Sequence, residues 1–358
     1  MADLELRTIT KRFGRITALD GVSFSVRDGE FFVLLGPSGA GKTTTLRVVA
    51  GLERPEQGRV LINGEDASDW PPAQRDVAFV FQQYSLYPTM SVYDNLAFPL
   101  RSPLRRVPEA VIRQRIHEVA EKLRIAHLLE RKTARLSGGE MQRVAIGRAM
   151  VRDPQLFLMD EPLSNLDAKL REALRVELKH VQKTRGSTTL FVTHDQIEAL
   201  TMADRIAVLE AGRIVQIGTP YDIYDRPATT FVAQLVGAPR INLLPAEPSD
   251  GALCVPDSPL RLPLEHVSAA LPERLTLGVR PEDVRLDPQG PFVGEIALVE
   301  PLGPETLLHL RVGAQMLIST LAGMPAVERN TSVRFTIPPR RVHVFGPDGR
   351  RLAGGETP

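Results

Sequence analysis

The sequence lacks the features of a disulfide-stabilised, metal-binding or membrane-spanning protein. Cys254 is the only cysteine among 358 residues, so an internal disulfide is excluded. No Cys/His cluster has the spacing of metal ligands. No uninterrupted apolar run approaches the roughly 18 residues of a transmembrane helix, and the N-terminus MADLELRTIT has no apolar signal-peptide core. We therefore expect a soluble, cytoplasmic chain.

An excess of charge of either sign is also missing. Lys and Arg total 44 against 43 Asp and Glu, which gives a net charge of +1. Without a basic field or an acidic tail, the composition predicts no nucleic-acid partner. The length is sufficient for two or more domains with a sizeable core.

A glycine-rich turn between a short apolar run and a helix dominates the N-terminal part. Phe31 to Leu35 predicts a buried strand, and the helix that follows has apolar residues on one side. The turn has the pattern G-x-x-x-x-G-K-[ST], in which backbone N–H groups and a lysine bind a polyphosphate and a hydroxyl faces Mg²⁺. The alternative is a glycine turn beside a surface lysine. The residues concerned are Gly36, Pro37, Ser38, Gly39, Ala40, Gly41, Lys42, Thr43 and Thr44.

Acidic residues and a histidine follow two further apolar strands. LFLMDEP ends in Asp160 and Glu161. A purely structural reason for this pair is hard to justify, because desolvated carboxylates are costly. Asp160 is suited to hold Mg²⁺, and Glu161 to orient or deprotonate an attacking water. TTLFVTH ends in His194, at the kind of strand end where ligands bind in α/β sheets.

Three further places allow a functional or a structural interpretation. Phe13 follows the first predicted strand, where it could stack on an adenine ring or pack in the core. Ser137 precedes two glycines and a helix, which is either a second anion site or a cap and turn. Asp167 is a predicted N-cap of a helix over 167–185 that ends at Gly186.

From about Pro239 the sequence changes character. Prolines become frequent, helical periodicity disappears, and short strands such as RLTLGV, FVGEIALVE and TLLHLRV recur. Even spacing with Gly/Pro turns predicts a small β-barrel domain.

The ordered motifs GPSGAGKT, FQQYSLYP, LSGGE, LMDEP, SNLD and VTHD resemble the nucleotide-binding subunit of ATP-binding cassette (ABC) transporters. LSGG is the specific part, because other phosphate-loop families lack it. The tail GTPYDIYDRPATTFVAQLVG and then GVRPEDVRL is similar to the maltose/glycerol-3-phosphate branch of importer ATPases. The resemblance implies an α/β phosphate-loop ATPase domain over 1–238 with an inserted helical subdomain over about 88–150, and an OB-like (TOBE) regulatory domain over 239–358.

The resemblance also assigns roles to residues of this sequence. It implies that Phe13 stacks on adenine, that Gln82 contacts Mg²⁺ and the attacking water, and that His194 contacts the γ-phosphate. Glu161 is implied as the general base, and Asp167 as a coupler of two active sites. The implied signature loop, which binds the ATP of an opposite protomer, is Ser137, Gly138, Gly139 and Glu140. The implied Mg²⁺ contacts are Thr43, Gln82 and Asp160, and the other catalytic residues are Lys42, Gln82 and His194.

Two residues depart from the commonest family pattern. Glu140 stands where glutamine is commoner, and Phe13 replaces a frequent Tyr or Trp.

The implied cofactors are ATP and Mg²⁺. The implied partners are a second copy of the chain, two integral membrane permease subunits, an extracytoplasmic solute-binding protein reached indirectly, and a regulatory protein on the C-terminal domain. The implied location of the chain is peripheral, at the cytoplasmic face of the cell membrane. The residues 84–88 and those just after resemble the surface that docks the permease. The sequence leaves three alternatives to a carbohydrate or glycerol-phosphate importer: a polyamine or inorganic-ion importer, a soluble ABC protein acting on ribosomes or DNA, and a regulatory module.

Overall fold

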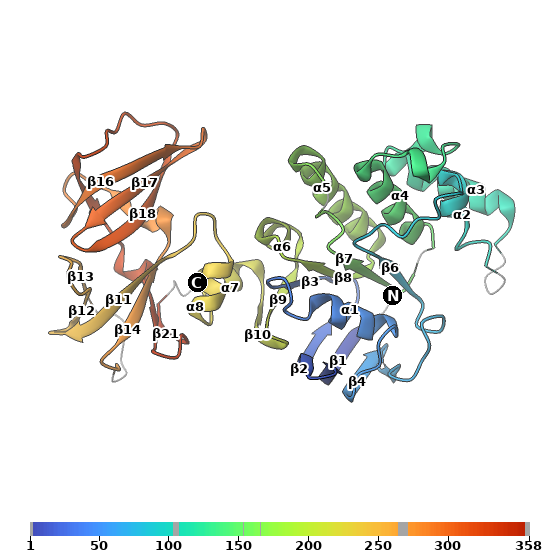
Figure 1. Cartoon of the computed structure of the whole chain (residues 1–358), viewed down its shortest axis with the longest axis horizontal. Coiled ribbons are helices and arrows are strands. Elements are labelled where there is room, and N and C mark those ends of the chain that lie inside the picture. Colours follow the sequence, from blue (N-terminus) through green and yellow to red (C-terminus); the bar gives the residue numbers. More distant parts are fainter. Residues whose placement is uncertain (1–2, 103–106, 153, 165, 264–270, 355–358) are drawn as a thin grey trace. The chain divides into compact units, whose positions relative to one another are not determined.

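The computed structural model describes residues 3–102, 107–152, 154–164, 166–263 and 271–354. The chain forms two compact units, Met1–Pro220 and Tyr221–Pro358. Each unit has its own hydrophobic core and its own sheets (Figure 1).

A six-stranded sheet with the order β10-β9-β3-β8-β7-β6 forms the centre of the first unit. The five strands from β9 to β6 run parallel, and β10 closes the edge as an antiparallel hairpin with β9. Every residue of β3, β7 and β8 is buried, as expected for parallel strands covered on both faces. The strands are β3 (Phe31–Leu35), β6 (Val77–Val80), β7 (Leu156–Asp160), β8 (Thr188–Thr193), β9 (Arg205–Glu210) and β10 (Arg213–Gly218).

A second, antiparallel sheet with the order β2-β1-β4-β5 covers one side of this unit. Helix α1 (Lys42–Ala50) lies between the two sheets (Figure 1), and its Leu46 and Val49 belong to a core that includes residues of both. The strands are β1 (Leu4–Phe13), β2 (Ile16–Val26), β4 (Gln57–Ile62) and β5 (Glu65–Asp66).

A helical subdomain is inserted between β6 and β7. Its helices are α2 (Val92–Ala97), α3 (Glu109–Lys122) and α4 (Gly138–Met150), with 3₁₀ turns η1 (Ala126–Leu128) and η2 (Thr133–Arg135). The apolar stripe of α3 is buried, since Ile112, Ile116 and Val119 are each no more than 1% exposed. The chain returns through α5 (Ala168–Arg185), which Asp167 caps as predicted and Gly186 ends with φ of 63°, and through α6 (Gln196–Met202).

The second unit contains two antiparallel sheets around one core. Their orders are β13-β12-β11-β14-β20-β21 and β15-β19-β16-β17-β18. This confirms the predicted small OB-like barrel. The first sheet has β11 (Asn242–Ser249), β12 (Ala252–Cys254), β13 (Arg261–Pro263), β14 (Leu275–Val279), β20 (His343–Phe345) and β21 (Arg351–Ala353). The second has β15 (Arg285–Leu286), β16 (Phe292–Pro301), β17 (Glu305–Val312), β18 (Gln315–Ala322) and β19 (Ser332–Thr336), with 3₁₀ turns η3 (Pro281–Asp283) and η4 (Pro339–Arg341).

The second unit begins about twenty residues before the change in sequence character at Pro239. Helices α7 (Pro220–Asp225) and α8 (Thr230–Leu235) precede its first strand. These helices belong to the second unit because of Arg280. This residue is 1% exposed and donates to the carbonyls of Tyr224, Ala233 and Val236. A buried guanidinium needs such acceptors, so it ties both helices to the barrel. Composition alone did not predict this tie.

Among the residues that the structure describes, no helix is both long and apolar enough to cross a membrane.

Candidate active site at the carboxyl ends of the parallel strands

The carboxyl ends of four adjacent parallel strands place the predicted motifs at one edge of the sheet. In β3 and β8, Leu35 pairs with Thr193, and in β7 and β8, Asp160 pairs with Val192. The glycine loop after β3, the histidine after β8 and the second carboxylate after β7 therefore emerge together. β6 lies beside β7 and ends at Val80, and Gln82 lies in the loop that follows.

The glycine loop folds tightly around the lysine. The Lys42 side chain is 5% exposed, and its Nζ donates to the carbonyls of Gly36 at 2.9 Å and Pro37 at 3.0 Å. Gly41 has φ of 106°, and a Cβ there would lie 2.5 Å from the Ala18 carbonyl oxygen. A Cβ on Gly36 would clash with the Leu209 carbonyl oxygen. The loop therefore requires glycine at both ends, because a side chain at either position would clash with a backbone carbonyl of the protein itself.

Thr43 and Asp160 form an oxygen-rich pair beside this loop. The Thr43 Oγ1 donates to Asp160 Oδ1 at 3.0 Å, and Asp160 is 5% exposed. Burial raises the pKa of the Asp160 carboxyl above its ordinary value, and the hydrogen bond from Thr43 opposes the rise. A hydroxyl and a carboxylate are oxygen ligands that Mg²⁺ prefers, so the pair fits that ion. In the described part of the chain no three His, Cys, Asp or Glu side chains form a metal cage.

Glu161 is the centre of a cluster of four side chains. Its carboxylate lies 3.5 Å from Lys42 Nζ, 2.9 Å from His194 Nδ1 and 3.4 Å from Gln82 Nε2. Its backbone has φ of 44°, in the left-handed region that non-glycine residues rarely adopt. Such strain persists where surrounding contacts hold it, and here the Glu161 N–H donates to the Val192 carbonyl at 3.0 Å. We define the Glu161 cluster as Lys42, Gln82, Glu161 and His194.

Ser137 and Glu140 cap helix α4 reciprocally and are not members of the Glu161 cluster. The Glu140 N–H donates to Ser137 Oγ at 3.3 Å, and the Ser137 N–H donates to Glu140 Oε2 at 2.7 Å. The hydrogen bond from the Ser137 backbone lowers the pKa of Glu140. The cap interpretation of Ser137 is therefore correct for the single chain, and it gives the unusual Glu140 a local partner for its charge. Gly138 and Gly139 form the first turn of this 13-residue helix, and Asp167 is at the start of α5.

Phe13 is the last residue of β1 rather than part of the following loop, and its side chain is 44% exposed. The core-packing alternative is therefore wrong. Its hairpin neighbour Ile16 is also exposed, at 69%. The Ala18 carbonyl of β2 lies where a Cβ on Gly41 would clash with it, so the hairpin that presents Phe13 lies next to the phosphate loop.

Two arginines near the site were not predicted from sequence. Arg171 contacts Asp195 at 3.3 Å and donates to the carbonyls of Ser164 and Leu166, which precede Asp167; Asn165 of the SNLD motif lies outside the described residues. Arg148 donates to the carbonyls of Ser85 at 2.8 Å and Tyr84 at 3.3 Å. Most of these acceptors are backbone carbonyls, which every residue has, so no sequence signal could have found the contacts.

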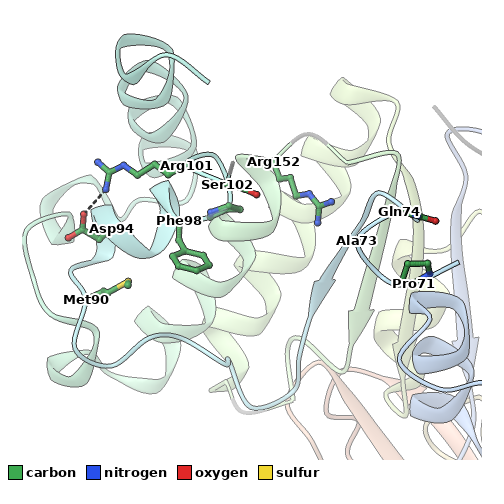
Figure 2. A pocket seen from close by; sticks show the side chains of 10 residues that line it. Pro71, Ala73, Gln74, Met90, Asp94, Phe98, Arg101, Ser102 and Arg152 are labelled. Atoms are coloured by element: carbon green, nitrogen blue, oxygen red, sulfur yellow. Dashed lines mark hydrogen bonds and ion pairs between the residues drawn. The ribbon is translucent and has the colours of Figure 1, made fainter. Parts of the chain in front are cut away.

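A cavity of about 1050 Å³ lies beside the helical subdomain. Figure 2 shows Phe98 and Met90 on its apolar side and the ion pair between Asp94 and Arg101, with 3.1 Å between the charged atoms. A second cavity of about 280 Å³ is lined by Ser85 and Tyr87, within the stretch that the sequence predicted as a docking surface, and by Phe98 and Arg148.

The fold and the Glu161 cluster define a phosphate-loop nucleotide hydrolase, in which a strand that ends in two carboxylates lies close to the phosphate loop. Comparison with known proteins narrows this class. The family model for ABC transporters matches residues 19–164, and the model for the TOBE domain matches residues 277–345.

Curated relatives match nearly the whole chain. The trehalose/maltose import ATP-binding protein MalK of Thermococcus litoralis is 46% identical, over 96% of this chain and 98% of its own length. The sn-glycerol-3-phosphate import ATP-binding protein UgpC of Bordetella avium is 44% identical, over 99% and 100%. Among solved structures, the dimeric ATP-binding cassette MJ0796 with ADP and Pi is 31% identical, with a TM-score of 0.55, over 61% of this chain and 98% of that one. The chain therefore belongs to the ABC transporter family of import ATP-binding proteins and is an ATP hydrolase.

Proposed function

We propose that this chain is the ATP-hydrolysing subunit that energises an ABC importer for a sugar, oligosaccharide, polyol or glycerol phosphate. The observation that carries the proposal is the identity of 43–46% to relatives named for trehalose/maltose, maltose/maltodextrin and sn-glycerol-3-phosphate import. The likeness extends over the C-terminal unit and is not limited to the ATPase motifs, which any ABC protein shares.

The phosphate loop and Lys42 bind the triphosphate. Lys42 Nζ exchanges the carbonyls of Gly36 and Pro37 for β/γ-phosphate oxygens, and the N-terminus of α1 adds partial positive charge. Thr43, Asp160 and Gln82 would hold Mg²⁺, which would neutralise phosphate charge. Phe13 stacks on the adenine. Loop backbone and Lys42 do most of the positioning, which is the main source of catalysis in phosphoryl transfer.

Glu161 is the general base. It accepts the proton of the water that attacks the γ-phosphate, while Gln82 helps to orient that water and His194 donates a hydrogen bond to the γ-phosphate. Gln82 and His194 each lie within hydrogen-bonding distance of the Glu161 carboxylate, at 3.4 Å and 2.9 Å.

One chain supplies one phosphate loop and one signature loop, so a complete pair of sites requires a homodimer. Ser137, Gly138 and Gly139 of one copy meet the γ-phosphate bound by the other, with the N-terminus of α4 directed at the anion. Asp167 couples the two sites. The dimeric state of the similar cassette MJ0796 supports this arrangement.

The partners of the dimer are two integral membrane permease subunits, so the chain is peripheral at the cytoplasmic face of the membrane. The two cavities beside the helical subdomain provide a docking surface for a permease segment, because they combine apolar Phe98 and Met90 with the charges of Asp94 and Arg101 (Figure 2). A solute-binding protein acts on the other side of the membrane. The OB-like domain receives a regulatory protein.

The cargo class is tested by ATPase assays on membrane vesicles that contain the chain, its permease and the solute-binding protein. We expect sugars or glycerol phosphate to stimulate ATP hydrolysis. Vesicles that contain Lys42→Ala are the negative control. Stimulation by polyamines or inorganic ions instead would replace the cargo assignment by the alternative importer class.

A further inference from the structure

We propose that Lys11 is a positioning residue for the nucleotide base: its ammonium holds the Phe13 ring in the orientation that stacks on adenine and so sets the affinity for the base. This inference deepens the proposed function and rests on it, because base stacking by Phe13 is itself part of that proposal.

Lys11 is a buried cation with a fixed position. It is 9% exposed, and its Nζ donates to the Arg54 carbonyl at 2.8 Å and to Glu56 Oε1 at 3.2 Å. Glu53 Oε2 lies 3.5 Å away. A lysine with these acceptors is not a mobile surface side chain, because moving it would leave the carbonyl and the carboxylates without their partner.

The Lys11 ammonium lies 5.1 Å from the centroid of the Phe13 ring, within cation–π distance. Phe13 nevertheless remains 44% exposed as a residue. One part of the ring therefore contacts a fixed charge while another is open to a ligand. The ammonium draws ring electron density toward itself, which leaves the open face better suited to stack on an electron-rich purine.

The acceptors of Lys11 connect this ring to the phosphate loop. Glu56 also accepts the Arg12 N–H at 2.6 Å, and its own N–H donates to the Thr10 carbonyl at 2.9 Å. The segment that holds Lys11 directly follows α1, whose first residue is Lys42. The segment that holds Lys11 and the helix that begins the phosphate site are thus continuous in the chain. The position of the adenine relative to the triphosphate therefore depends on the Lys11 contacts.

The test is the affinity of the full chain for MgATP and for magnesium tripolyphosphate, measured by titration calorimetry. Tripolyphosphate probes the phosphate loop without a base. We expect Lys11→Met to weaken MgATP binding by about threefold to tenfold, the range that cation–π strength implies, and to leave tripolyphosphate binding unchanged. In a Phe13→Ala background the same substitution is expected to have no further effect on MgATP.

Lys179→Met is the matched control. Lys179 also lies over a phenylalanine, 5.0 Å from the Phe31 centroid, and pairs with Asp204 at 2.8 Å. Phe31 begins β3, at the edge opposite the phosphate loop, so MgATP affinity should not change. If Lys11→Met does not fold, as judged by thermal unfolding, Lys11→Gln decides the question, because it keeps a donor for the Arg54 carbonyl and removes the charge.

Equal losses for MgATP and tripolyphosphate would overturn the inference, because Lys11 would then act on the phosphate site. Unchanged MgATP affinity in Lys11→Met would also overturn it. Failure of the proposal that Phe13 stacks on adenine gives a different result. Phe13→Ala would then bind MgATP as tightly as the unsubstituted chain, while Lys42→Ala would lose binding.

Discussion

Replacing Glu161 by glutamine removes one negative charge and one proton acceptor while keeping the size of the side chain. The amide can still accept a hydrogen bond from His194 or Gln82, which lie 2.9 Å and 3.4 Å from Oε2. Lys42 loses an ionic neighbour at 3.5 Å but keeps the carbonyls of Gly36 and Pro37. The groups that bind phosphate therefore remain in place, and the proton transfer alone is lost.

The expected loss in turnover follows from general-base catalysis, which contributes roughly 10²–10⁴-fold, or about 3–5 kcal/mol of barrier. Because binding is retained and hydrolysis is slow, Glu161→Gln chains should accumulate as dimers that hold MgATP. Steady-state phosphate release measures the first effect, and light scattering with and without MgATP measures the second.

Glu30→Gln is the matched control for this substitution. Glu30 is a buried carboxylate paired with Arg205 at 3.4 Å, and it immediately precedes β3, at the end of that strand opposite the phosphate loop. Its turnover should stay within about twofold of the unsubstituted chain. Normal turnover in Glu161→Gln would refute the assignment of the base. Loss of MgATP-dependent dimerisation in Glu161→Gln would refute the inference that this substitution removes proton transfer and leaves MgATP binding intact.

Three further predictions concern the phosphate loop and the Mg²⁺ pair. Lys42→Ala should weaken MgATP binding by more than about tenfold, because charge-assisted phosphate contacts disappear; unchanged affinity in calorimetry would discredit the loop. Asp160→Asn should raise the unfolding temperature of the nucleotide-free chain at pH 7, since burial raises the pKa of Asp160 and folding then costs free energy once the group is ionised. The gain should shrink as the pH falls through the raised pKa toward the ordinary value of 3.8, and a gain that grows at low pH would contradict this sign. Gly41→Ala should destabilise the chain by about 1–3 kcal/mol in denaturant titrations, because φ is 106° and the Ala18 carbonyl is 2.5 Å from the added carbon. Gly39→Ala, also at positive φ but with no atom within 4 Å, is its control and should cost less.

Local sequence signals predicted much of the fold and the gathering of the site residues. A buried strand followed by a glycine loop, or by two carboxylates, is encoded within a few residues, so Lys42, Asp160 and Glu161 could be placed at strand ends. Parallel strands then align those ends at one edge.

Long-range contacts could not be predicted in the same way. Arg280 sets the start of the second unit through three carbonyls on α7, α8 and the residue that follows α8. Arg148 and Arg171 also donate to backbone carbonyls. Because every residue has a carbonyl, the sequence does not indicate which ones these arginines bind. Whether Phe13 is buried depends on what covers the end of β1, which its neighbours in sequence do not specify. The left-handed backbone of Glu161 is set by tertiary contacts as well.

Purification of the tagged chain from native membranes in mild detergent, with identification of the proteins that accompany it, determines whether the chain assembles with a membrane permease. A chain with the tag and the Asp94→Arg substitution in the larger cavity is the matched control for docking (Figure 2). The importer account predicts two polytopic membrane subunits with the unsubstituted chain and their loss with the control. Recovery of soluble partners alone would contradict the transport function, although the chain would remain an ATP hydrolase.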